Sequence, residues 1–164
     1  MMKRIHVIRH AKSSWADEGM RDFDRPLNER GKANAPIMAN RLHSRIGAID
    51  FIVCSPAKRT RQTAAYFCKA FGYDEKQIHF VEKIYEAPLS ALIETVNALP
   101  DDKNEVLFIG HNYGVSHLVN YLTGERVDMP TCAMATVEIP FDRWAMIIEE
   151  CATLAAYDYP KNNV

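Results

Sequence analysis

The sequence lacks an apolar run long enough to span a membrane, and it lacks any Cys-x-x-Cys pair. The apolar stretch near the N-terminus is interrupted at His6 and stopped at Arg9, so it is too short for the core of a signal peptide. The four cysteines are scattered at positions 54, 68, 132 and 151. We therefore expect a cytoplasmic protein whose cysteines are reduced and mostly serve in packing.

An excess of either charge is also missing. Lysine and arginine number 20 against 21 aspartates and glutamates, which gives a formal net charge of −1. No overall field therefore favours nucleic acid or an anionic membrane as a partner, and neither is expected. Chemistry on an anionic substrate would have to depend on a local concentration of cations.

What the sequence does contain is an alternation of short apolar stretches and amphipathic ones. Strands are expected at about 5–8, 49–54, 78–81 and 105–109, each followed by a helical pattern. This order predicts an α/β fold of three layers, with a mostly parallel central sheet flanked by helices. Two further strands, at 134–139 and within 144–157, could pair antiparallel at an edge. No repeat or linker divides the chain, so 1–164 is predicted to be a single domain.

Helix boundaries carry their own signals. Asn28 can cap the first helix, which would end near Gly47, and Pro36 should kink it or delay its regular part. Ser55 as N-cap, with Pro56 at the first helical position, indicates the start of the second helix.

Residues suited to phosphate chemistry follow the predicted strands or open the second helix: Arg9, His10, Lys12, Arg59, Glu86 and His111. Because the carboxyl ends of parallel strands meet at one edge of a sheet, these side chains are expected to converge on one cleft. The N-terminus of the second helix would add backbone amides and a favourable dipole for an anion.

Three motifs, in this order, resemble the histidine phosphatase superfamily. They are Arg9-His10 with the following Lys12-Ser13-Ser14-Trp15, the segment 55–64 around Arg59, and Gly110-His111-Asn112. The compact length and the stretches RHAKSSW and DRPLNERG are most similar to SixA-type phosphohistidine phosphatases. The resemblance covers nearly the whole chain and implies a phosphoglycerate mutase-like fold.

The resemblance implies a phosphatase that needs no metal or other cofactor. His10 would attack the phosphoryl group and become a phosphohistidine. Arg9 and Arg59 would hold the phosphoryl oxygens, and His111 would donate to them in the transition state. Glu86 would protonate the leaving group and later deprotonate the attacking water. The other predicted phosphate ligands are Lys12, Ser13 and Asn112.

Two positions depart from the family pattern. Ala11 stands where glycine is usual, and its methyl group would narrow the approach of the backbone to phosphate. The sequence around Glu86 only loosely resembles the family's carboxylate motif, and Glu82 is a weaker rival for the same role. A metal site is disfavoured, because His6 and His10 on one strand would be about 13 Å apart.

The leading hypothesis is the dephosphorylation of protein phosphohistidine. Fewer than thirty residues separate the third predicted strand from His111, which leaves little room for a lid over a small substrate or a mutase intermediate. The imidazole of phosphohistidine is also a leaving group that is easily protonated. The alternatives are a phosphatase of small monoesters, such as sugar or nucleotide phosphates, and a non-catalytic module that binds phosphoproteins. The sequence does not define the oligomeric state.

Overall fold

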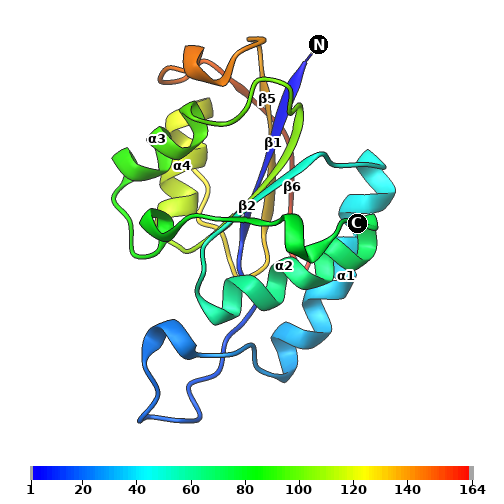
Figure 1. The fold of residues 1–164 in the computed structure, drawn as a ribbon, viewed down its shortest axis with the longest axis vertical. Helices are drawn as coiled ribbons and strands as arrows, with labels where there is room; N and C mark the ends of the chain where they lie inside the picture. Colours follow the sequence, from blue (N-terminus) through cyan, green and yellow to red (C-terminus); the bar gives the residue numbers. More distant parts are fainter. Residues whose placement is uncertain (1, 163–164) are drawn as a thin grey trace.

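A six-stranded sheet crosses the computed structural model, which describes residues 2–162 (Figure 1). The elements are β1 (Lys3–Arg9), α1 (Glu29–Ile46), β2 (Phe51–Cys54), α2 (Lys58–Phe71), β3 (His79–Phe80), α3 (Leu89–Asn97), β4 (Glu105–Gly110), α4 (Gly114–Thr123), β5 (Met134–Ile139) and β6 (Thr153–Asp158). Two short 3-10 helices also matter for the site: η1 (Asp22–Asp24) and η3 (Glu82–Ile84).

The strand order is β3-β2-β4-β1-β5-β6. Strands β1 to β4 are parallel to their neighbours in this group, whereas β5 is antiparallel to both β1 and β6. The predicted α/β fold with a mostly parallel sheet and antiparallel pairing toward one edge is therefore confirmed. β3 is shorter than the predicted strand at 78–81, since only His79 and Phe80 belong to it.

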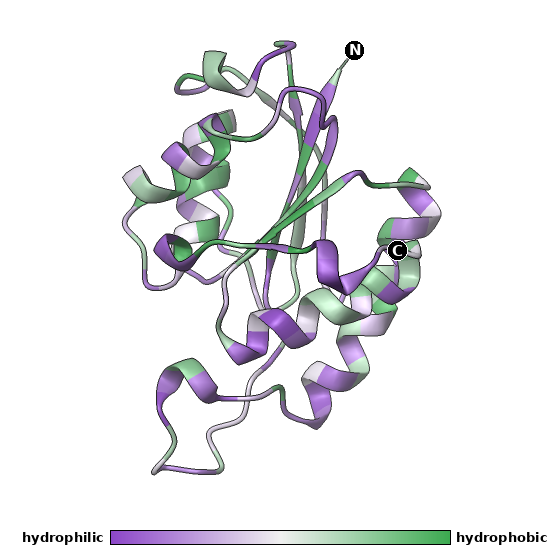
Figure 2. Ribbon diagram, in the orientation of Figure 1, coloured by the Kyte–Doolittle hydropathy of each residue, from purple (hydrophilic) through white to green (hydrophobic). Residues whose placement is uncertain are grey.

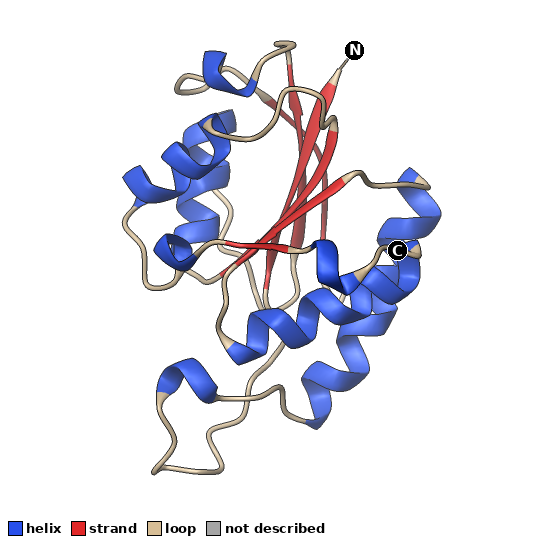
Figure 3. Cartoon of the chain, in the orientation of Figure 1, coloured by secondary structure: helices blue, strands red, loops and turns tan. Residues whose placement is uncertain are grey.

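Helices cover both faces of the sheet and make the three predicted layers. Figure 3 shows α1 and α2 together on one side and α3 and α4 on the other. Alternate residues of β1 supply both cores: Ile5 and Val7 pack toward α3 and α4, whereas Ile8 packs toward α1 and α2. Figure 2 shows the strands mainly hydrophobic and much of the outer helix surface hydrophilic. Because these strands are buried on both faces of the sheet, their sequences are nearly continuous apolar runs.

The start of α1 is fixed against the loop that follows β1. The Asn28 side chain accepts a hydrogen bond from the Gly31 amide at 2.8 Å, as predicted for an N-cap, and the Asn28 amide donates to the Lys12 carbonyl at 3.0 Å. A Cβ atom on Gly31 would lie 2.2 Å from that same carbonyl oxygen. The DRPLNERG stretch therefore brings α1 into backbone contact with the loop. The helix then continues through Pro36.

The predicted cap of α2 is wrong. α2 begins at Lys58, its N-cap position is Ala57, and no side chain caps it. The Ser55 hydroxyl lies within hydrogen-bond distance of His111 Nε2, at 2.8 Å. The same hydroxyl accepts a hydrogen bond from the Ala57 amide at 3.4 Å, so Ser55 links the loop after β4 to the residue that precedes α2.

Candidate active site

The two histidines that follow β1 and β4 lie side by side. The last residues of these strands, Arg9 and Gly110, are paired in the sheet, and the His10 amide donates to the Gly110 carbonyl at 3.0 Å. The ring centroids of His10 and His111 are 5.3 Å apart. The chain leaves β1 and β4 on opposite faces, toward α1 and α4, so the histidines lie at the switch point where α/β sheets bind ligands.

His10 is buried and held in one orientation. Its side chain is 6% exposed, and Nδ1 donates to the Ala11 carbonyl at 2.7 Å, so Nε2 is the nitrogen with a free lone pair. Burial lowers the pKa of His10 to about 3, and the charges of Arg59 and Arg9 act in the same direction. The imidazole is therefore neutral near pH 7, which is the state a nucleophile requires.

The available nitrogen of His111 is Nδ1, whereas that of His10 is Nε2. The Ser55 oxygen already accepts from the Ala57 amide at 3.4 Å, so its proton is assigned to His111 Nε2. This places the proton of the neutral ring on Nδ1, a buried atom that no group in residues 2–162 accepts from. Burial lowers the pKa of His111 to about 4, and Arg59 contributes in the same direction. His111 therefore offers a neutral N–H donor beside His10.

Three buried side-chain nitrogen atoms have no hydrogen-bond partner within the described residues: Arg9 Nε, Arg59 Nε and His111 Nδ1. A buried donor without a partner costs roughly 1–3 kcal/mol, so such groups are rare unless a ligand uses them. All three belong to residues that the sequence predicts as phosphate ligands. Arg9 and Arg59 act electrostatically on His10, and the His111 ring lies 5.3 Å from it, so the three donors and the nucleophile form one anion-binding cluster.

The two guanidinium groups are held through their terminal nitrogens. Arg9 Nη1 donates to the Met129 carbonyl at 2.9 Å. Arg59 donates from Nη1 to the Asp22 carbonyl at 2.7 Å and from Nη2 to Asp22 Oδ2 at 3.0 Å. These contacts use Nη atoms only, so each Nε–H stays available for an oxyanion.

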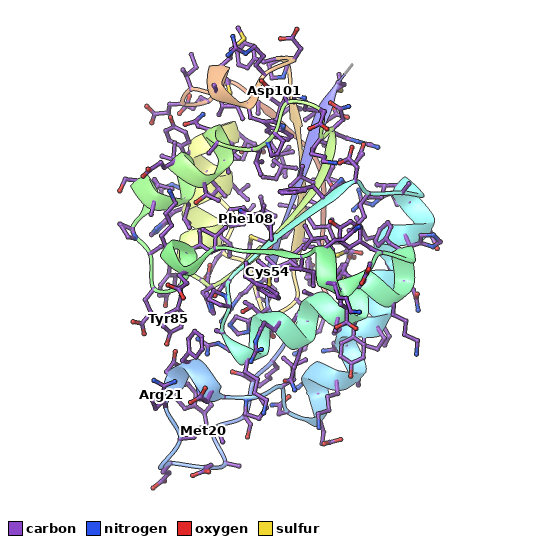
Figure 4. The ribbon with its side chains drawn as sticks, in the orientation of Figure 1. Met20, Arg21, Cys54, Tyr85, Asp101 and Phe108 are labelled. Carbon is purple, nitrogen blue, oxygen red and sulfur yellow. The ribbon has the colours of Figure 1, made fainter. Side chains whose placement is uncertain are left out.

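Asp22 is a site residue that sequence reasoning missed. Its carboxylate also accepts from the Tyr85 hydroxyl at 2.7 Å and from Arg25 Nε at 3.0 Å. Burial alone would raise the pKa of Asp22, but the hydrogen bonds from Tyr85, Arg59 and Arg25 outweigh it and lower the pKa to about 2. Figure 4 shows Tyr85 facing the loop that carries Met20 and Arg21. No strand precedes Asp22, so the strand-end criterion could not find it.

Glu86 and Asn112 line a pocket of about 230 Å³ together with His111. Glu86 is exposed and has a φ of 51°. Asn112 bonds the Ser116 hydroxyl and, at 3.4 Å, Asp128. Glu82 is not among the residues that line this pocket.

The structure does not bring Lys12 and Ser13 into the donor cluster. The Ser13 hydroxyl accepts from Arg25 Nη1 at 2.7 Å and so braces its own loop. Lys12 is exposed and lines a different hollow. The methyl group of Ala11 is fully buried in the core beneath α1 and α2.

All four cysteines are free thiols, in agreement with the sequence. Burial raises the pKa of Cys132 to about 12. Its amide donates to the His10 carbonyl at 3.0 Å, so Cys132 supports the backbone of the loop. Within residues 2–162 no three acidic, histidine or cysteine side chains are grouped in a way that would hold a metal ion. No helix in that range has the length and apolarity to cross a membrane.

Comparison with protein families gives a match over the first half of the chain. The model of the histidine phosphatase superfamily (branch 1) matches residues 5–89. An uncharacterised protein of Mycobacterium tuberculosis is 32% identical over 165 residues, which cover 94% of this chain and 100% of the relative.

Two solved structures are similar over almost their whole length. SixA of Agrobacterium tumefaciens, provisionally assigned as a phosphohistidine phosphatase, has 28% identity and a TM-score of 0.83, and the match covers 98% of this chain and 99% of that chain. The protein histidine phosphatase SixA solved with tungstate has 23% identity and a TM-score of 0.80, and the match covers 96% and 97%. At that lower identity the likeness concerns the fold alone.

Proposed function

This chain belongs to the histidine phosphatase superfamily and is a phosphatase, and we propose that it dephosphorylates protein phosphohistidine with His10 as nucleophile. One observation carries the assignment of the site. A neutral, buried His10 lies among three buried N–H donors that no group in residues 2–162 accepts from, and a phosphoryl group would satisfy all three. The similarity to the Agrobacterium tumefaciens SixA structure supports the choice of substrate.

In the first step, His10 Nε2 attacks phosphorus in line with the bond to the leaving nitrogen. The new Nε2–P bond forms as the old P–N bond breaks, and the leaving imidazole takes a proton from Glu86. Charge on the equatorial oxygens is met by Arg9 Nε, Arg59 Nε and His111 Nδ1. The Nδ1–H bond to the Ala11 carbonyl stabilises the positive ring of the phosphohistidine.

In the second step, water adds to phosphorus while the Nε2–P bond breaks. Glu86, now a carboxylate, takes the proton from that water and is ready for the next cycle. His10 departs as the neutral ring that began the reaction, because Nδ1 keeps its proton throughout. The residues in the cluster, together with Glu86, therefore complete the cycle without a metal ion.

The choice of a protein substrate follows from access and leaving-group chemistry. The only elements between β3 and β4 are η3 and α3, so within the described chain no inserted domain covers the site. Imidazole is protonated more easily than an alkoxide, so an exposed carboxyl such as Glu86 suffices as acid. We propose that the partner is a phosphohistidine-bearing protein, and that the enzyme acts in the cytoplasm as a single domain.

The experiment that tests the substrate compares kcat/KM on a phosphohistidine-bearing protein with kcat/KM on a panel of sugar and nucleotide phosphates. We expect the phosphoprotein to be the faster substrate. A higher kcat/KM on a small monoester would contradict the proposed substrate and indicate a phosphatase of sugar or nucleotide phosphates. Binding of phosphoprotein without any turnover would leave only the non-catalytic module.

A further inference from the structure

A second hollow, of about 350 Å³, borders the loop that carries His10. It is lined by the loop after β1, the first turns of α1, the segment before β5 and the C-terminal segment. Three of its lining side chains are cations: Lys12, Arg30 and Lys161. The lining contains no carboxylate, and within residues 2–162 none of these three cations takes part in an ion pair.

This local charge contrasts with the rest of the chain, whose formal net charge is −1. Three like charges around one hollow repel one another, and an anion bound between them relieves that repulsion. Asn34, Thr131 and Tyr159 line the same hollow and add neutral hydrogen-bond donors. Pro130 and Pro160 give it apolar walls. Cations, neutral donors and apolar walls together fit a carboxylate side chain carried on a peptide.

The hollow is close to the nucleophile along the backbone. Lys12 is two residues from His10, so their Cα atoms are at most about 7 Å apart. On the other wall, Thr131 precedes Cys132, whose amide donates to the His10 carbonyl at 3.0 Å. An extended peptide advances about 3.3 Å per residue, so a side chain two to four positions from a residue bound at His10 can reach the hollow.

We propose that this hollow binds an acidic side chain of the substrate protein, two to four residues from the phosphohistidine, and so contributes to substrate choice. The proposal rests on the function proposed above. It gives Lys12 a role outside the donor cluster, and it adds Arg30 and Lys161, which were not among the predicted site residues.

The test uses two phosphohistidine peptides that differ only in having glutamate or glutamine at these positions. We expect wild-type kcat/KM to be about fivefold to tenfold higher for the glutamate peptide, and the preference to shrink with added salt, because several exposed ion pairs contribute modestly and are screened. The double variant Arg30→Glu/Lys161→Glu should lose the preference while keeping its kcat/KM on phosphoramidate. Lys69→Glu is the control: it is exposed and ten residues beyond Arg59 on α2, about 15 Å along the helix.

Equal kcat/KM on the two peptides in the wild type would overturn the proposal, as would a preference that survives in the double variant. A separate measurement keeps the result independent of turnover. Fluorescence anisotropy with the unphosphorylated peptides should show tighter binding of the glutamate peptide to the wild type than to the double variant. If the enzyme hydrolysed no phosphohistidine, the proposed function would fail, while this binding difference would still decide whether the hollow takes carboxylates.

Discussion

At the scale of single residues, His10 is made a nucleophile by its surroundings. Its Nδ1 is bound to the Ala11 carbonyl, its ring is buried, and its neighbours are positive groups that disfavour a second proton. An exposed histidine would be partly protonated near neutral pH and would have no fixed orientation. The nucleophile therefore depends on Arg9 and Arg59 even before a substrate binds.

Replacing His10 with glutamine tests this role. His10→Gln keeps a polar side chain of similar size but has no nucleophilic imidazole, so we expect no trapped phosphoenzyme and a kcat reduced by about 10³-fold or more. Rapid acid-free quenching with labelled substrate measures the intermediate. His79→Gln, an exposed position on β3, should label like the wild type. Labelling that persists in His10→Gln would assign the nucleophile to another residue.

At the scale of elements, the approach of α1 to the catalytic loop requires Gly31. Any Cβ atom there would overlap the Lys12 carbonyl, so Gly31→Ala must move either α1 or the loop. We expect a loss of about 2 kcal/mol in the free energy of unfolding and a lower kcat. Urea denaturation and steady-state kinetics measure the two effects. Lys32→Ala, the next helix position, should leave both near the wild type, and an unchanged Gly31→Ala enzyme would contradict the packing argument.

A second element-scale contact joins η1 to α2 through Asp22. Asp22→Asn keeps an oxygen that can accept from Arg59 but removes the negative charge beside the phosphate cluster. We expect the inhibition constant of inorganic phosphate to fall severalfold, because the positive field of Arg59 is less compensated. Asp22→Ala, which frees the Arg59 side chain, should raise the same constant. If both variants shifted the inhibition constant of inorganic phosphate in the same direction, Asp22 would not have two separate roles, one through its charge and one in positioning Arg59.

At the scale of the whole molecule, the buried neutral histidines couple stability to pH. The pKa of His10 is about 3 and that of His111 about 4 in the folded protein, both below the ordinary value of 6.5. Between pH 3 and pH 6.5 these two histidines bind more protons in the unfolded chain than in the folded one. The contribution of the neutral histidines to the free energy of unfolding is therefore fully present above pH 6.5 and is lost as the pH falls toward 3.

We expect the free energy of unfolding to decrease by about 2 kcal/mol from pH 6.5 to pH 5 on account of His10 alone. Urea denaturation at pH 7, 6 and 5 measures this decrease. The His10→Gln variant has no group to protonate at this position, so its stability should fall less over the same interval. Parallel decreases in the wild type and the variant would show that His10 is not the group responsible.

The sequence by itself determined the parts of this protein that depend on short-range pattern. The alternation of apolar strands and amphipathic helices predicted the parallel sheet, and Asn28 and Gly47 marked the ends of α1 where they are found. Strand ends also predicted that His10 and His111 would meet, because parallel strands must share an edge. Local sequence patterns were therefore sufficient to predict the features that depend on backbone periodicity or on strand direction.

The tertiary structure alone decided which groups face the substrate and which hold them. Asp22 reaches Arg59 across 37 residues of sequence, and Ser55 reaches His111 across 56. Ser55 was predicted as a helix cap because its neighbours favour one, yet a distant imidazole competes for the same hydroxyl. Hydrogen bonds between remote segments form only after the sheet has brought them together, so no local pattern in the sequence can encode them.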